Sequence, residues 1–258
     1  MKTCLMVLLL ALMLENSVIA AADLERERRM AEEISDVILD GEVEMLRAGD
    51  HEFLSIYTEA ESATRALLII HGRGFHPDWA DTVQPLRVEL VEYGWNTLSI
   101  QMPVLGKEAK YYDYLPIFDE AIPRIEAGLE FLRAQGNTNI VIVAHSCGVH
   151  MSMHYLKQQG DDQLSAYVGI GMGATDYRQP MLEAFPLKAI SVPVLDIYGA
   201  EDYPAVRRMA PARWQHIQAA GNSLSAQKVV DDADHYFTDQ GDLLVEAVGE
   251  WLGSLNIE

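Results

Sequence analysis

One short stretch, Asn139 to His150, limits what this chain can fold into more than any other. It begins with four consecutive β-branched residues, Ile140 to Val143, which is typical of a strand buried on both faces of a sheet. Ala144-His145-Ser146-Cys147-Gly148 follows, and apolar residues then recur at helical spacing. A serine at a sharp turn between a strand and a helix is a nucleophile elbow, and the pattern here is A-x-S-x-G. We therefore predict that Ser146 is a nucleophile, the alternative being an ordinary polar residue at a turn.

A serine hydroxyl reacts only when a neighbouring base takes its proton and a carboxylate orients that base. In open α/β sheets such groups collect at the carboxyl ends of the strands. Asp202 follows a predicted strand at 194–198, and His235 follows another at 227–230. The order Ser, Asp, His along the chain is the one expected for this kind of elbow. We therefore predict a triad of Ser146, Asp202 and His235.

Other residues could fill these roles. Asp176, after the preceding strand, is the alternative acid, and Glu201 could substitute chemically although it adjoins the predicted acid. His71 lies at a strand end but precedes the nucleophile in the chain. His145 is next to the nucleophile on the turn, where adjacent side chains point apart.

Attack on an ester also requires hydrogen-bond donors for the oxyanion that develops. The backbone N–H of Cys147, directly after the nucleophile, is one donor expected from the elbow. The second should come from His71-Gly72-Arg73-Gly74, which follows a predicted strand at 65–70. We expect the N–H of Arg73, with Gly74 as the alternative. Cys147 could itself be a nucleophile, but an elbow presents its central residue.

The sequence predicts no metal and no cofactor. His150 and His154 have the i, i+4 spacing of zinc ligands but lack the glutamate of H-E-x-x-H and a third ligand, so we expect a packed or solvated pair. Asp231, Asp232 and Asp234 could bind calcium, although a charged turn near the surface is the simpler interpretation.

A long connection, residues 101–116, carries Tyr111, Tyr112 and Tyr114. It leaves the carboxyl end of a predicted strand at 97–100, so it can reach over Ser146. Rings with apolar faces and polar tips are suited to holding a substrate, but they could equally pack the loop onto the domain.

Strands alternate with helices along the whole chain, which predicts an α/β fold with a mostly parallel sheet and helices on both faces. Short strands at 42–46 and 52–57 predict an antiparallel hairpin at its start. About twenty residues separate Gly171 from Pro193, too few for a large cap domain. We expect one domain at 23–258, with helices near 23–39, 77–93, 117–135, 204–219 and 241–253 and a further strand at 167–170.

Residues 1–22 have the features of a secretory signal peptide: Lys2, an apolar run and Ala20-Ala21-Ala22. The alternative is an uncleaved anchor, because basic residues follow at Arg26, Arg28 and Arg29. Cleavage would leave no stable membrane span. It would also remove Cys4, so that Cys147 remains as a single cysteine and no intramolecular disulfide can form.

The chain has 258 residues and a formal net charge of −20. So acidic a surface disfavours nucleic acid and anionic membranes as partners, and it is typical of a soluble protein. The sequence predicts no oligomeric state.

These motifs resemble the α/β-hydrolase superfamily over nearly all of the chain after residue 22. The resemblance rests on His71-Gly72, Ala144 to Gly148, Gly199-Ala200-Glu201-Asp202 and Asp234-His235. His71 to Trp79, Pro85-Leu86-Arg87, Leu98 to Pro103 and Val194 to Gly199 are similar to an uncharacterised family of exported bacterial α/β-hydrolase-like proteins. The wider resemblance implies the same triad.

We therefore expect a serine hydrolase that cleaves small-molecule or lipid esters of carboxylic acids. Two alternatives are an acyltransferase with the same triad and a binding protein that keeps the fold without turnover. The protein should be exported, to the periplasm or the medium.

Protein from its native host should begin at Asp23 or Ala21, because small residues stand at the required positions before both. Intact-mass measurement decides this. A mass that includes residues 1–22 favours the anchored alternative.

Overall fold

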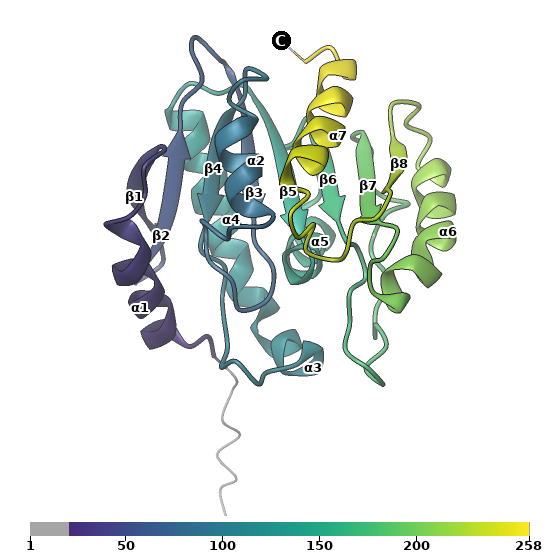
Figure 1. The fold of residues 1–258 in the computed structure, drawn as a ribbon, viewed down its shortest axis with the longest axis horizontal. Coiled ribbons are helices and arrows are strands. Elements are labelled where there is room, and N and C mark those ends of the chain that lie inside the picture. The colour runs from purple at the N-terminus through teal and green to yellow at the C-terminus, as the bar shows by residue number, and fades with distance from the viewer. Residues whose placement is uncertain (1–20, 258) are drawn as a thin grey trace, which may run out of the picture.

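The computed structural model describes residues 21–257, which contain one eight-stranded sheet in the order β1-β2-β4-β3-β5-β6-β7-β8 (Figure 1). β1 and β2 form an antiparallel hairpin, β2 is antiparallel to β4, and the pairs from β4 to β8 are parallel. The predicted sheet and hairpin are confirmed. The strands are β1 (Glu42–Ala48), β2 (His51–Thr58), β3 (Arg65–Ile70), β4 (Asn96–Ile100), β5 (Asn139–His145), β6 (Ala166–Ile170), β7 (Val194–Gly199) and β8 (Ala226–Val230).

Helices cover both faces of this sheet. The helices are α1 (Leu24–Ser35), α2 (Val83–Glu89), α3 (Tyr111–Tyr114), α4 (Ala121–Ala134), α5 (Cys147–Gln159), α6 (Pro204–Ala219) and α7 (Gly241–Ser254), with a 3-10 helix, η1 (Leu115–Glu120), before α4. In Figure 1, α2 and α7 lie in front of the sheet, and α4 and α5 lie behind it.

The central strands are apolar throughout because both of their faces are covered. In β3, Leu67 and Ile69 belong to the core beneath α2 and α7, whereas Leu68 and Ile70 belong to the core that contains α4 and α5. This alternation follows from the two-residue period of a strand.

Two segments refine the sequence-based expectations, and a third confirms one of them. The helix expected at 117–135 begins as η1, with Pro116 in its first turn, and becomes α-helical at Ala121. The long connection at 101–116 contains the short helix α3. Residues 171–193 contain no helix or strand, so the prediction that a large cap domain is absent is confirmed.

Most of the predicted signal peptide, residues 1–20, lies outside the described residues, and cleavage stays a prediction. Within residues 21–257, no helix is both long and apolar enough to cross a membrane.

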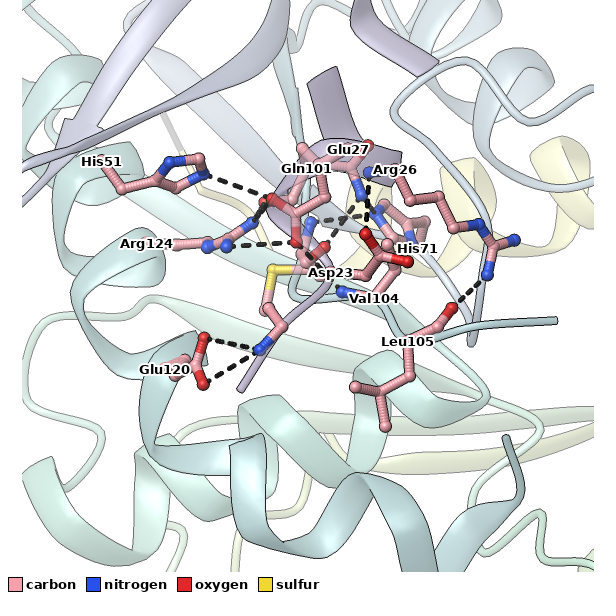
Figure 2. A network of polar contacts seen from close by, with 12 residues as sticks. Asp23, Arg26, Glu27, His51, His71, Gln101, Val104, Leu105, Glu120 and Arg124 are labelled. Atoms are coloured by element: carbon pink, nitrogen blue, oxygen red, sulfur yellow. Dashed lines mark hydrogen bonds and ion pairs between the residues drawn. The ribbon is translucent and has the colours of Figure 1, made fainter. Parts of the chain in front are cut away.

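A buried ion pair attaches α1 to the rest of the domain (Figure 2). Glu27 is 4 % exposed, and its carboxylate accepts hydrogen bonds from Arg124 at 2.8 and 3.2 Å. The same carboxylate accepts the backbone N–H of Val104 at 3.1 Å and lies 3.3 Å from His51 Nε2. The alternating glutamates and arginines of α1 predict salt bridges on its outer faces. Arg29 and Glu25 form such a pair, but Glu27 points inward.

Glu27→Ala should lower the free energy of unfolding by about 3–5 kcal/mol, because it leaves the buried guanidinium of Arg124 without its carboxylate. Urea unfolding measures this. The double variant Glu27→Leu/Arg124→Met should recover most of the loss, since it removes both charges. Glu25→Ala, which breaks an exposed pair, is the control and should have little effect. Equal losses in Glu27→Ala and Glu25→Ala would contradict a stabilising role for the buried pair.

Candidate active site

Ser146 lies at the turn between β5 and α5, with φ 55° and ψ −116°. A positive φ is uncommon for a residue with a side chain, and such backbone strain is concentrated at functional sites. The Ser146 N–H donates to the carbonyl oxygen of Ile170 at 2.9 Å, which ties the turn to the neighbouring strand. The side chain is half-buried and lines a surface cleft, so its hydroxyl can meet a substrate.

Gly148 is required by the close approach of the turn to β3. A Cβ atom at this position would lie 2.5 Å from the carbonyl oxygen of His71 and 2.8 Å from that of Ile70. Both distances are shorter than any normal contact. This is the steric reason for a small residue at the end of A-x-S-x-G.

The structure brings the three predicted triad residues together. Ser146 Oγ lies 2.8 Å from His235 Nε2, and His235 Nδ1 lies 2.7 Å from Asp202 Oδ1. Because a carboxylate only accepts, Nδ1 carries the proton and Nε2 is free to accept the serine proton. Asp202 follows β7 and His235 follows β8, so both side chains reach the carboxyl edge of the sheet.

Gly171, after β6, has no side chain and so leaves space for the ring of His235. It has φ +63°, and a Cβ there would lie 2.8 Å from His235 Cε1. His235 is 2 % exposed and Asp202 1 %, so water has little access to the bond between their side chains.

The alternative acids lie elsewhere. Asp176 pairs with the guanidinium of Arg73 and accepts the backbone N–H of Tyr111 at 2.7 Å, away from His235. Partial burial alone would raise the Asp176 pKa, but Arg73 and the Tyr111 N–H outweigh it and lower that pKa. Glu201 is exposed to solvent.

Arg73 and Cys147, the predicted oxyanion donors, both line the cleft beside Ser146. Gly74 does not line this cleft; its carbonyl oxygen accepts a hydrogen bond from Arg26 at 3.1 Å. The Cys147 thiol is buried, and burial raises its pKa to about 12. At neutral pH it therefore stays protonated, which argues against Cys147 as a nucleophile.

A buried histidine fixes the loop that carries Arg73. His71 Nδ1 donates to the carbonyl oxygen of Gly72 at 2.7 Å, and His71 Nε2 accepts the Met102 N–H at 2.9 Å. This pattern requires a neutral ring, and burial lowers the His71 pKa to about 3. The sequence marks His71 as a possible base and as the first residue of the predicted oxyanion loop, but not as the residue that holds this loop. The informative signal was a pair of polar residues, His71 and Gln101, that each directly follow a central strand.

The same histidine is connected to α1 (Figure 2). Gln101 Nε2 lies 2.9 Å from His71 Nε2, and the Gln101 carbonyl oxygen accepts Arg124 Nη1 at 3.1 Å. Arg124 in turn pairs with Glu27. A continuous buried path therefore links the first helix to the candidate oxyanion loop.

Two further tyrosines, which no motif of the sequence marks, contact the ring of His235. The ring of Tyr203 stacks on His235 with centroids 4.1 Å apart, and its backbone N–H donates to Asp202 Oδ1 at 2.5 Å. Its hydroxyl lies 2.6 Å from that of Tyr236. Each of these tyrosines directly follows a triad residue in the chain, which was the available signal.

The cleft over Ser146 has a volume of about 640 Å³. Of the three tyrosines in the long connection, Tyr111 lines it. Tyr112 instead donates its hydroxyl to the carbonyl oxygen of Pro180 at 3.1 Å. Tyr114 is fully buried, and its hydroxyl accepts the Leu105 N–H at 2.9 Å. The positions of Tyr112 and Tyr114 fit the packing interpretation, whereas that of Tyr111 fits contact with a substrate.

The histidine and aspartate groups considered for metals have other partners. His150 Nε2 donates to the carbonyl oxygen of Ala174 at 2.9 Å, and His154 Nε2 lies 2.6 Å from Asp119. Asp234 accepts the Tyr236 N–H at 2.9 Å and also bonds Thr238, while Asp231 and Asp232 are exposed. No cluster of three or more potential metal ligands occurs in residues 21–257.

Three buried histidines should make the fold sensitive to acid. Burial lowers the pKa of His71 and His145 to about 3 and that of His150 to about 4. In the unfolded chain their pKa is about 6.5, so the unfolded state binds more protons as the pH falls below that value. Their contribution to the free energy of unfolding is complete above about pH 6.5. Below that pH each contribution falls by about 1.4 kcal/mol per pH unit, until the pH reaches the pKa of that histidine in the folded protein.

Urea unfolding at about pH 7.5, 6 and 5 tests this expectation. His150→Gln can still donate to Ala174 but cannot titrate, so it should reduce the pH slope by about a third. A free energy of unfolding that is constant over this range would contradict the expectation.

Comparisons with known proteins give the family and the fold of this chain. A family model described as "Protein of unknown function (DUF3530)" matches residues 13–113 and 117–245. No curated protein matches the sequence.

Several solved structures have a similar fold. The Pyrococcus furiosus esterase Pf2001 has a TM-score of 0.66 and 17% identity, covering 86% of this chain and 95% of its own. Est1E from Butyrivibrio proteoclasticus has a TM-score of 0.63 and 15% identity, covering 84% and 99%. Dienelactone hydrolase from Anabaena variabilis has a TM-score of 0.62 and 17% identity, covering 83% and 97%. The resemblance found in the sequence is confirmed: the chain has the α/β-hydrolase fold and belongs to the family described as DUF3530.

Proposed function

We propose that this protein is a serine hydrolase that cleaves carboxylic esters through an acyl-enzyme on Ser146. One observation carries the proposal: the unbroken hydrogen-bonded series from Ser146 Oγ through His235 to Asp202, at 2.8 and 2.7 Å. The Pyrococcus furiosus esterase and the dienelactone hydrolase among the structures of similar fold support it.

In the first half-reaction, His235 Nε2 takes the proton of Ser146 as Oγ attacks the ester carbonyl carbon. Asp202 stabilises the imidazolium that forms. The backbone N–H groups of Cys147 and Arg73 are the proposed donors to the oxyanion. The imidazolium then protonates the departing alcohol, leaving an acyl group on Oγ.

In the second half-reaction, His235 removes a proton from water as the water oxygen attacks the acyl carbon. The imidazolium then returns this proton to Ser146 Oγ as the bond between Oγ and the acyl carbon breaks, which releases the acid and restores the free enzyme. If an alcohol enters instead of water, the same steps transfer the acyl group. The proposed substrate is a small-molecule or lipid ester, and the proposed location is outside the cytoplasm after removal of residues 1–22.

Ser146→Ala should lower kcat for short p-nitrophenyl esters by about 10⁵–10⁶-fold, because the acyl-enzyme cannot form. Asp202→Asn should lower it less, since nucleophile and base remain. Labelling by a fluorophosphonate probe gives a second readout that does not depend on the ester chosen.

The matched control is Cys147→Ala, one residue away, which should keep the labelling that Ser146→Ala abolishes. Normal ester hydrolysis by Ser146→Ala would refute the proposal. Labelling of Ser146 without hydrolysis of any ester, but with acyl transfer to an added alcohol, would favour the acyltransferase. Absence of labelling in the folded wild-type protein would favour a binding protein.

A further inference from the structure

The wall of the cleft is more positive than the composition of the chain would suggest. The sequence has 39 acidic residues against 19 lysines and arginines. The residues that line the cleft nevertheless include Arg73, Arg178 and Arg208 against one carboxylate, Asp176. The residues that line the cleft therefore carry a net positive charge, whereas the whole chain is strongly negative.

Two of these three arginines are not neutralised. Asp176 pairs with Arg73. Arg178 and Arg208 are exposed, and within residues 21–257 neither forms an ion pair. The guanidinium of Arg178 lies 4.9 Å from the ring centroid of Tyr177, a contact that orients it without removing its charge.

The two side chains come from different segments on the same cleft. Arg178 belongs to the connection between β6 and β7, and Arg208 to the second turn of α6. Rings from the same two segments, Tyr177 and Tyr203, line the cleft beside them. An apolar surface with cationic donors at its mouth suits a ligand that is partly aromatic or aliphatic and carries an anion.

We propose that this cleft selects esters that carry an anionic group, a carboxylate or a phosphate, which binds Arg178 and Arg208. This proposal rests on the proposed function and narrows its substrate class. The net charge of −20 opposes anions at a distance, but at about 0.1 M salt charges are screened beyond about 10 Å. Local arginines therefore dominate inside the cleft, and the acidic remainder of the surface favours a substrate with a single anionic group over a polyanion.

Matched esters test the selection. 4-Acetoxybenzoate carries the anion on the alcohol side, and monophenyl terephthalate carries it on the acyl side. Each is compared with its neutral carboxamide. The wild type should show a higher kcat/KM for the anionic ester than for its carboxamide in at least one pair. That pair shows whether the anion is recognised on the alcohol side or on the acyl side of the ester. Arg178→Gln and Arg208→Gln should each reduce the anion-to-neutral ratio by about two- to fivefold, and added salt should reduce it as well.

Arg207→Gln is the control, because Arg207 is equally charged and adjacent but does not line the cleft; its side chain donates to the carbonyl oxygen of Ala200. It should keep the wild-type ratio. Anion-to-neutral ratios of one or less in both pairs, or a ratio that falls as much in Arg207→Gln as in Arg208→Gln, would overturn the proposal.

A binding measurement separates this proposal from the proposed function. Benzoate, phenyl phosphate and benzamide are titrated into Ser146→Ala and followed by ligand-observed NMR. Tighter binding of either anion than of benzamide, lost in Ser146→Ala/Arg178→Gln/Arg208→Gln, supports anion selection even if no ester is hydrolysed. The anion that binds more tightly indicates whether the recognised group is a carboxylate or a phosphate. Binding of both anions no tighter than benzamide, including no detectable binding of any of the three, overturns it.

Discussion

The main-chain conformation of Ser146 is the constraint on which the rest of this structure depends. A positive φ between a strand and a helix turns the hydroxyl out of the sheet edge while the next N–H begins α5. The Ser146 N–H donates a hydrogen bond to Ile170 of β6. The turn also lies so close to the end of β3 that a Cβ atom at Gly148 would clash with it. Ser146 is thus positioned by three adjacent strands.

Neutral buried imidazoles are the second constraint. His71 and His145 are both buried near the turn at Ser146. A ring nitrogen of each donates a hydrogen bond to a backbone carbonyl oxygen. An imidazolium could not accept the Met102 N–H as His71 does, so this arrangement requires the uncharged form. The candidate oxyanion loop therefore depends on a residue that takes no part in the proposed chemistry.

Much of this molecule could be predicted from its sequence because the signals are local. The strand-turn-helix pattern around Ser146, and the acidic and histidine residues within five positions of the ends of β7 and β8, follow from short patterns and the rule for strand ends. The role of Glu27 could not be predicted, because the helical pattern of α1 does not show which charged residue meets a partner 97 positions away. Likewise, three tyrosines of one connection are alike in sequence, and only the packed fold distinguishes Tyr111 from Tyr114.

Cys147, the residue after Ser146, has a practical consequence for measuring conformational change with site-specific labels. Once residues 1–22 are removed, Cys147 is the sole thiol in the chain, and it is both buried and held protonated. Maleimides and iodoacetamides react with exposed thiolates, so Cys147 should react slowly with them. A cysteine introduced at Leu182 or Leu243, both exposed, would then take up a dye or spin label selectively. Pairs of such labels would report distances between α7 and the connection from β6 to β7 in a protein whose native cysteine is left in place.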